Sequence, residues 1–490
     1  MVDSIGTKRG RGSTGVLVAV LLLVEAAGIF EHTMVLGAFP FFSEHFGVDL
    51  AAVSWVLTTF VLVGAASAIV AGRLGDMYGR KRVLIVLLAI SLVGSLLTIA
   101  FGTFEALLAG RALQGTSAGI IPLLIGITRE ALPKERVPVT VALLTATATI
   151  TAGIGILVAG IFVDAGLWLG MFVTAAALCG VCILLTIVVI PRSRSTKSGS
   201  RIDWLGAVLF APAIGAVLLG LTALRGTGFG SPSVWLPIGL GLVVLAAWVA
   251  WELRVTDPLV NLRLIATPSM RRMMGVILIA GVAPLSAITI LGPVVILSPA
   301  EFSVGVGLTA TTYGIVSLAS SAVTFALTPL AGILARRRGA AASMVVGLSM
   351  FLLVYVALAL PMGHGSAPVA IAIMMVGTVA NAFVISSIYN LIVEVVPAEA
   401  TSEYTGVGQV ARNTSIAVGT AVTATILSLS TEPGTSVPTE ASWTWMSIYV
   451  IAVTVAALAL SVSILVRRRR SGVVPADADS PESVEAPAVG

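Results

Sequence analysis

The sequence predicts an all-α polytopic membrane protein, and three observations lead to this prediction. Of the 490 residues, 57% are hydrophobic and only 10% are charged, whereas soluble proteins carry about 25% charged residues. The apolar residues form runs of about 20, the length that an α-helix needs to cross the hydrocarbon core. The basic residues form short clusters between these runs, which is typical of loops on one side of a membrane. This composition excludes a soluble enzyme, and the clustering argues against a nucleic-acid-binding surface.

Fourteen apolar runs are long enough to span a membrane. They cover residues 15–38, 51–71, 83–101, 105–127, 138–161, 167–190, 204–224, 233–251, 273–297, 308–334, 341–361, 368–393, 405–429 and 443–466. The first run follows basic residues, as the apolar part of a signal peptide would. No small-residue cleavage site follows it, and Glu25, Glu31 and His32 interrupt it, so we expect a retained first span.

The Lys and Arg residues predict the orientation of the chain. Of the 28 basic residues, 25 lie in segments that would share one side of the membrane, whereas Arg225 alone lies on the other side. Arg111 and Arg412 lie within spans. The positive-inside rule then places both termini in the cytoplasm, with the spans in the cytoplasmic (inner or plasma) membrane. If the number of spans were wrong by one, the basic segments would no longer all fall on the same side of the membrane.

An internal repeat indicates how the spans are organised. Segment 72–82 reads GRLGDMYGRKR and segment 332–339 reads GILARRRG, so that Gly, Leu and Gly recur at the same spacing, offset by 260 residues. Tight cytoplasmic turns could use Gly and Arg independently, but the matching place of the segments favours a duplication, as in alternating-access transporters. The expected parts are an N-terminal cytoplasmic segment 1–14, a six-span bundle 15–203, two inserted spans 204–252, a second six-span bundle with its preceding loop 253–466, and a tail 467–490. We expect the tail to be disordered because Pro, Ala, Ser, Asp and Glu dominate it.

Segment 72–82 resembles the signature loop of the major facilitator superfamily, G-x-L-x-D-r-x-G-r-k-R, at every fixed position. The resemblance implies the major facilitator fold, two six-helix bundles, here with two inserted helices. Asp76 is expected at a helix end, within reach of basic residues and a helix N-terminus, while the glycines permit close helix approach and a tight turn. We expect a conformational gate formed by Gly72, Asp76, Gly79, Arg80, Arg82, Gly332 and Arg336.

Three further segments resemble members of the superfamily. Residues 111–115 read RALQG, like the family's R-x-x-Q-G. Residues 31–40 read EHTMVLGAFP, similar to the D-x-T-x-V-x-x-A-x-P pattern of the fourteen-span drug/proton antiporters, with Glu in place of Asp. Residues 251–260, WELRVTDPLV, also look like that subfamily. One departure concerns antiport: Ile156 stands where antiporters carry a kink-forming proline.

Charged residues within the spans are costly and default to functional hypotheses. Glu25, Glu31, His32 and Arg111 are predicted to form a proton relay. Two alternatives remain open. Glu25 could instead be the countercharge of a cationic substrate, or a static Glu–Arg pair could simply join the first and fourth spans.

A second set of polar residues is predicted to line a substrate cavity. Its members are Glu25, Gln114, Asn381, Tyr389 and Arg412. Structural and substrate-binding roles are equally open for Arg412, and Asn or Tyr side chains also bridge membrane helices.

These features together predict a proton-coupled secondary exporter of amphipathic or lipophilic small molecules, cationic or neutral, of the drug-efflux type. The alternative is a facilitator or a lipid or metabolite exporter without obligatory proton antiport. The sequence contains no Walker loop, metal-binding cluster or nucleophile constellation, so we expect no enzyme, cofactor or metal. The expected partners are the substrate, protons and the lipid bilayer, and we expect a monomer that binds no nucleic acid.

Overall fold

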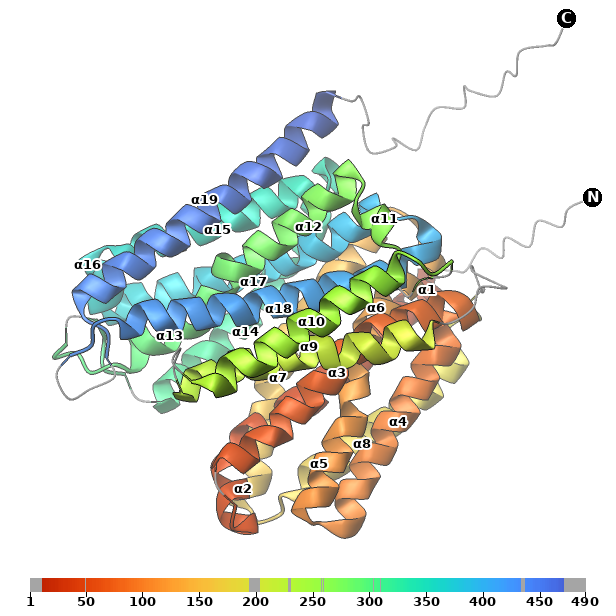
Figure 1. Cartoon of the computed structure of the whole chain (residues 1–490), viewed down its shortest axis with the longest axis horizontal. Helices are drawn as coiled ribbons and strands as arrows, with labels where there is room; N and C mark the ends of the chain where they lie inside the picture. Colours follow the sequence, from red (N-terminus) through yellow and green to blue (C-terminus); the bar gives the residue numbers. More distant parts are fainter. Residues whose placement is uncertain are drawn as a thin grey trace, which may run out of the picture.

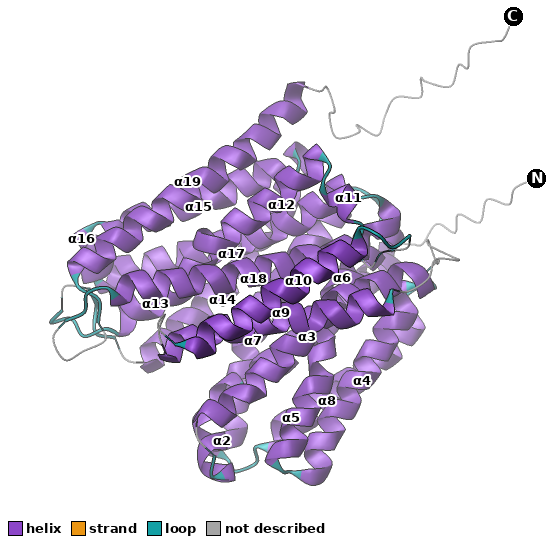
Figure 2. Cartoon of the chain, in the orientation of Figure 1, coloured by secondary structure: helices purple, strands orange, loops and turns teal. Residues whose placement is uncertain are grey.

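The structure is a computed structural model that describes residues 11–470, except for 49, 194–202, 228–230, 257, 259, 303, 309 and 433–436. All named elements in these residues are helices, as Figure 2 shows. The expected segment 1–14 and the expected disordered tail 467–490 lie outside the described residues, apart from 11–14 and 467–470.

The first half of the chain forms a helical bundle, with the short helix α2 between α1 and α3. Its helices are α1 (Arg11–Thr33), α2 (Phe39–Phe46), α3 (Leu50–Tyr78), α4 (Arg80–Phe101), α5 (Phe104–Gly115), α6 (Ile120–Ala131), α7 (Val137–Asp164) and α8 (Leu169–Val189). A 3-10 turn, Thr116–Gly119, joins α5 to α6, so that the two form one span.

The second half of the chain forms the other bundle after an inserted helix pair. The inserted helices are α9 (Trp204–Thr227) and α10 (Pro232–Glu252). The helices that follow are α11 (Leu262–Ile265), α12 (Pro268–Ala280), α13 (Ser286–Leu297), α14 (Ala310–Arg338), α15 (Ala340–Ala359), α16 (Pro361–Gly365), α17 (Ala367–Val395), α18 (Thr401–Ser428) and α19 (Glu440–Arg470). A π-helical turn, Gly281–Leu285, contains Pro284 and joins α12 to α13.

Twelve helices in the described residues are long and apolar enough to cross a membrane. The two other expected spans correspond to α9, of which only Val208–Val217 is identified as an apolar segment, and to α18. Helix α18 is rich in Thr, Ser and Gly and carries Glu403 and Arg412, which lowers its mean hydropathy. A multi-pass helical membrane protein is therefore confirmed, and the count of fourteen spans stays a prediction.

The repeated segments are helical rather than the loops that the sequence suggested. Helix α3 continues to Tyr78 and α4 begins at Arg80, so that only Gly79 lies between them. Gly339 occupies the same place between α14 and α15. Both glycines have a positive φ, +97° and +87°, a conformation that other residues rarely adopt. A single left-handed glycine is thus enough to reverse the chain, because it relieves the clash that a Cβ atom would cause.

The two halves meet at the end of the molecule that contains the α3–α4 turn, which we call the turn end. Figure 1 shows the halves in contact near α6 and α11 and diverging toward α2 and α16. Helix α3 packs against α18, and α7 packs against α14. A Cβ atom added to Gly72 would collide with the main-chain oxygen of Ser402, and one added to Gly332 would collide with that of Pro138. The internal repeat therefore has a counterpart in the packing, since corresponding glycines let corresponding helices touch.

The inserted pair α9 and α10 covers one side of this junction. Helix α9 packs against both α3 and α18. A buried apolar cluster holds the three helices and α10 together, and it includes Ile69, Phe210, Trp248 and Val410. The inserted helices thus shield the contact between the two halves on that side.

We predict that Gly72→Ala disfavours the closed junction. The added methyl group has no room against α18, and overpacking of this kind costs about 1–3 kcal/mol. A cysteine introduced by Ser402→Cys, at a position that is buried in this conformation, should then react with a maleimide at least about fivefold faster.

Gly180→Ala is the matched control, because nothing lies within 4 Å of a Cβ atom added there. The native Cys179 and Cys182 are buried, and their reaction is measured in the protein without Ser402→Cys. Equal labelling rates in the Gly72→Ala and Gly180→Ala backgrounds would contradict the prediction.

Candidate functional site

Asp76 lies where α3 meets the beginning of α18. One carboxylate oxygen accepts hydrogen bonds from Arg80 Nε at 3.0 Å and from Arg80 Nη2 at 2.8 Å. The other oxygen accepts from the main-chain N–H of Glu403 at 3.0 Å. Glu403 lies in the first turn of α18, where free N–H groups and the helix dipole favour a negative charge. Asp76 therefore caps a helix of the opposite half.

Two arginines add further bonds across the same junction. Arg80 donates from Nε to Ser402 Oγ at 2.9 Å and from Nη2 to the carbonyl of Ala398 at 2.9 Å. Arg73 forms an ion pair with Glu403, in which Nη1 lies 2.9 Å from Oε2. Both partners of this pair are buried, so that opening the junction would separate two opposite charges that compensate each other while the halves are together.

Arg129, at the end of α6, forms a third link to the second half. Its Nη1 donates to the carbonyl of Val396 at 2.7 Å and to Thr401 Oγ1 at 2.6 Å. Together with the bonds of Asp76, Arg73 and Arg80, it holds the turn end of the molecule closed.

The seven residues expected in the gate occupy different positions. Gly72, Asp76 and Arg80 lie in the closed junction. Gly79 lies against Ser193 of the first half, and Gly332 packs against α7. The side chains of Arg82 and Arg336 are exposed and make no hydrogen bond or ion pair with other described residues. Arg336 is at the position of the second repeated segment that corresponds to Asp76. The second copy therefore lacks the acidic residue on which the charge network of the first copy depends.

A cavity of about 380 Å³ lies beyond this junction, between the two halves. Helices α1, α3 and α6 and the Thr116–Gly119 turn line it from the first half, and α18 lines it from the second half. Its lining residues are Glu25, Gly28, Ile29, His32, Phe60, Val61, Gly64, Ala65, Ala68, Ser117, Ala118, Ile120, Ile121, Gln409, Val410, Arg412, Asn413, Thr414 and Ala417. The lining is mostly apolar with a few polar groups, as is usual for small-molecule sites.

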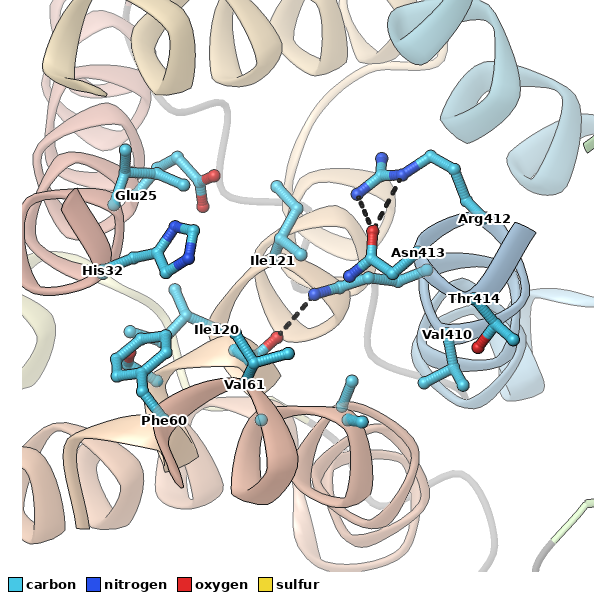
Figure 3. A pocket seen from close by; sticks show the side chains of 18 of the residues that line it. Glu25, His32, Phe60, Val61, Ile120, Ile121, Val410, Arg412, Asn413 and Thr414 are labelled. Atoms are coloured by element: carbon cyan, nitrogen blue, oxygen red, sulfur yellow. Dashed lines mark hydrogen bonds between the residues drawn. The ribbon is translucent and has the colours of Figure 1, made fainter. Parts of the chain in front are cut away.

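Two opposite charges face this cavity from different halves, as Figure 3 shows. Glu25 of α1 is 5% exposed and makes no hydrogen bond or ion pair with other described residues. Arg412 of α18 donates from Nη1 to Tyr389 Oη at 2.9 Å, and from Nε and Nη2 to Asn413 Oδ1 at 3.3 and 3.2 Å. Tyr389 is buried behind Arg412, with the guanidinium carbon 5.4 Å from its ring centroid, and is not part of the cavity lining.

Phe60 links the cavity to a buried polar group in the first half. Its ring stacks on that of His32, with the centroids 5.1 Å apart, and the guanidinium carbon of Arg111 lies 4.3 Å from the same ring. His32 lines the cavity, whereas Arg111 is 0% exposed and does not.

Arg111 binds Glu31 through the main chain rather than through an ion pair. Its Nη1 donates to the carbonyl oxygen of Glu31 at 2.6 Å and to Gln114 Oε1 at 2.9 Å, and its Nε donates to the carbonyl of Val56 at 3.2 Å. The Glu31 carboxylate instead accepts from Ser91 Oγ at 2.5 Å and from Cys179 Sγ at 3.1 Å. Arg111 therefore joins α1, α3 and α5, and no ion pair of 4 Å or less connects it to Glu31.

The remaining residues expected in the substrate cavity lie outside it in this conformation. Gln114 is buried and donates from Nε2 to Ser95 Oγ at 2.8 Å, and Asn381 is half-buried in α17. Neither lines the cavity. No group of three His, Cys, Asp or Glu side chains in the described part of the chain could hold a metal ion.

Sequence reasoning did not single out several residues of this site. Arg73 and Glu403 form an ion pair between segments that are 330 residues apart, and Phe60 resembles any other apolar residue of its span. The signal that could have identified Glu403 is its charge, two residues before a predicted span.

Two helical halves around a shared cavity, closed at one end by contacts between them, define a polytopic membrane transporter. A model of the Major Facilitator Superfamily matches residues 21–420 and 277–488. The chain belongs to the major facilitator superfamily, and it is a transporter rather than an enzyme.

Three curated relatives illustrate the range of similar transporters. The uridine/deoxyuridine transporter of Lactococcus lactis subsp. cremoris is 27% identical over 69% of this chain and 71% of its own length. The cephamycin export protein of Amycolatopsis lactamdurans is 28% identical over 54% of this chain and 56% of its own length. The lincomycin resistance protein of Streptomyces lincolnensis is 28% identical over 53% of each chain. The last two alignments thus span only about half of those relatives.

A solved structure supports the fold independently. The human organic anion transporter MFSD10 (TETRAN) superposes with a TM-score of 0.60, covering 91% of this chain and 99% of that chain at 15% identity. At this identity the similarity shows the fold alone.

We predict that Asp76→Asn leaves the protein in the membrane but reduces transport at least about tenfold. An amide has one acceptor oxygen, and its NH2 group would face the N–H donors of Arg80 or of Glu403. Each hydrogen bond to a charged group is worth about 1.5–3 kcal/mol, so the balance between conformations should shift. Efflux from energised cells, normalised to the amount of protein in the membrane, measures the effect.

Asp164→Asn is the control for this variant, because Asp164 is exposed at the end of α7. Normal efflux by Asp76→Asn protein at normal membrane levels would rule out a role for the Asp76 charge.

A further prediction concerns the stability of the first half. Arg111→Ala removes the donor to three buried acceptors on α1, α3 and α5. Each hydrogen bond from a charged group is worth about 1.5–3 kcal/mol, so the free energy of unfolding in detergent should fall by about 3 kcal/mol or more. Denaturant titration measures this, with the exposed Arg271→Ala as control. An unchanged free energy of unfolding combined with lost proton coupling would show that Arg111 acts in proton transfer instead.

Proposed function

We propose that this protein is a proton-coupled secondary active exporter that moves amphipathic small molecules by alternating access. The observation that carries the proposal is a carboxylate without a bonding partner, Glu25, in a mainly apolar cavity between two halves that are closed at one end. A buried carboxylate without hydrogen-bond donors is costly, so Glu25 is expected to have a function. Binding a proton or a cationic group would remove that cost.

The asymmetric distribution of Lys and Arg supports the orientation of the proposed exporter. With 25 basic residues on one side, the turn end and both termini would face the cytoplasm of the inner or plasma membrane. The conformation described here would then be closed toward the cytoplasm. We propose a monomer that works with protons, substrate and the lipid bilayer alone.

The proposed cycle needs one protonatable carboxylate in contact with the cavity. Glu25 takes up a proton while the cavity faces outward, which neutralises the site and releases the substrate. The proton leaves toward the cytoplasm after the halves change conformation, and the charged site is restored. Glu31 and His32, on the same helix, are the alternative carriers, but the Glu31 carboxylate is bonded to Ser91 and Cys179 within the first half.

Two relatives favour drug efflux as the physiological process. Their names describe cephamycin export and lincomycin resistance, and residues 31–40 and 251–260 resemble the fourteen-span drug/proton antiporters. We therefore propose multidrug efflux with a contribution to antibiotic resistance, and membership of that fourteen-span subfamily.

The alternative is a facilitator or a metabolite exporter without obligatory proton antiport. A relative named as a nucleoside transporter supports it, as does Ile156 at the position of the antiporters' proline. Flux from proteoliposomes with and without an imposed pH gradient separates the two. Flux that ignores the pH gradient would favour the facilitator.

We predict that Glu25→Gln abolishes the pH dependence of transport. The amide resembles a permanently protonated carboxyl, so a proton can no longer be taken up and released at this position. Transport rate is measured against pH for the wild type and for Glu25→Gln, with the exposed Glu44→Gln as control. Identical curves for wild type and Glu25→Gln would show that Glu25 is not the carrier.

A further inference from the structure

The charges of the cavity indicate the kind of substrate that it takes, an inference that rests on the proposed function. We propose that the cavity binds a zwitterionic amphipathic molecule, with its cationic group at Glu25 and its anionic group at Arg412. The apolar part of the molecule would contact the apolar wall of the cavity.

Glu25 supplies the negative end of this site. Its carboxylate points into the cavity (Figure 3), and its side chain makes no hydrogen bond or ion pair with other described residues. The group is 5% exposed, so little water can compensate its charge. An ammonium group would provide both the countercharge and the missing hydrogen-bond donors.

Arg412 supplies the positive end from the opposite half. Its acceptors are the hydroxyl of Tyr389 and the amide of Asn413, both of them neutral. These three bonds use three of the five N–H groups of a guanidinium, which leaves two for a ligand. Among the described residues, no carboxylate lies within 4 Å of Arg412. The guanidinium is thus held in place without being neutralised, as an anion-binding group should be.

The cavity keeps the two charges apart, so that neither is bonded directly to the other. Glu25 is on α1 and Arg412 on α18, on opposite sides of the cavity, and they form no ion pair. Apolar side chains such as Val61, Ile121 and Val410 line the wall as well. A molecule with both charges satisfies both ends, whereas a singly charged molecule leaves the other end without a countercharge. The site should therefore discriminate against simple cations and simple anions.

Binding to purified protein tests this with one scaffold in four charge states. The dipeptide phenylalanylphenylalanine carries both charges. Its C-terminal amide carries the cation alone and its N-acetyl derivative the anion alone, while its N-acetyl amide carries neither. Isothermal titration should show the zwitterion binding at least about tenfold more tightly than each singly charged form, because each form lacks one charge-assisted interaction.

Two substitutions assign the ends of the site. In Glu25→Gln the zwitterion should bind no better than the N-acetyl derivative, and in Arg412→Gln no better than the amide. Arg412→Lys, which keeps the charge, should retain the preference of the wild type. Glu44→Gln and Arg271→Gln, at exposed positions, are the matched controls and should retain it too. Gel filtration of each variant verifies that it is folded.

The outcomes separate this inference from the proposed function. Failure of the zwitterion to bind, equal binding of all four probes, or tightest binding of the cationic amide overturns the inference. If the cationic amide binds most tightly, efflux of a panel of lipophilic cations driven by an imposed pH gradient would still support the proposed exporter. If a pH gradient drives the efflux of none of the compounds, the proposed function is overturned. Selective binding of the zwitterion would still support the assignment of the two charges in that case.

Discussion

The rest of the structure depends on the contact between α3 and α18, where Gly72 and Gly406 let two backbones touch. Only helices without side chains at this point can approach so closely. The approach brings the carboxylate of Asp76 to the first turn of α18 and Arg73 to Glu403. Beyond the contact the helices separate, and the cavity occupies the space between them. One small-residue contact thus closes one end of the molecule and determines where a ligand can bind.

Charges at the closed junction and at the cavity follow the same physical rule but with different results. At the closed junction, Asp76, Arg73 and Arg80 find partners in the opposite half, so their burial is compensated while the halves are together. Glu25 has no such partner in the cavity, and Arg412 has only neutral ones. The junction is therefore satisfied by the protein itself, whereas the cavity is left for a proton or a ligand to satisfy. A transporter needs both kinds of site. Charges paired within the protein stabilise one conformation, whereas unpaired charges in the cavity are available to the ligand.

Much of the fold was predictable, because the hydrocarbon core requires long apolar helices and allows little else. The prediction was weakest for α18, whose polar residues face the first half of the molecule and the cavity rather than lipid. It was wrong for segment 72–82, where helices replace the expected loop. Of the site, Gly72, Asp76, Glu25 and Arg412 were identified because a motif or an intramembrane charge marks them. Phe60 was not, since an aromatic residue in an apolar span carries no distinguishing signal.

The sequence by itself determined the helical membrane class, the duplication and the positions of the costly charges, because hydropathy and charge are properties of local segments. Only the tertiary structure decided which charges meet. It showed Arg111 bound to the main chain of Glu31 rather than to its carboxylate, and Arg82 and Arg336 outside the junction. It also placed Glu25 and Arg412, 387 positions apart in the chain, on opposite walls of one cavity. The physical reason is that such pairs depend on how helices cross, and the crossing is set by close packing among residues from all parts of the chain.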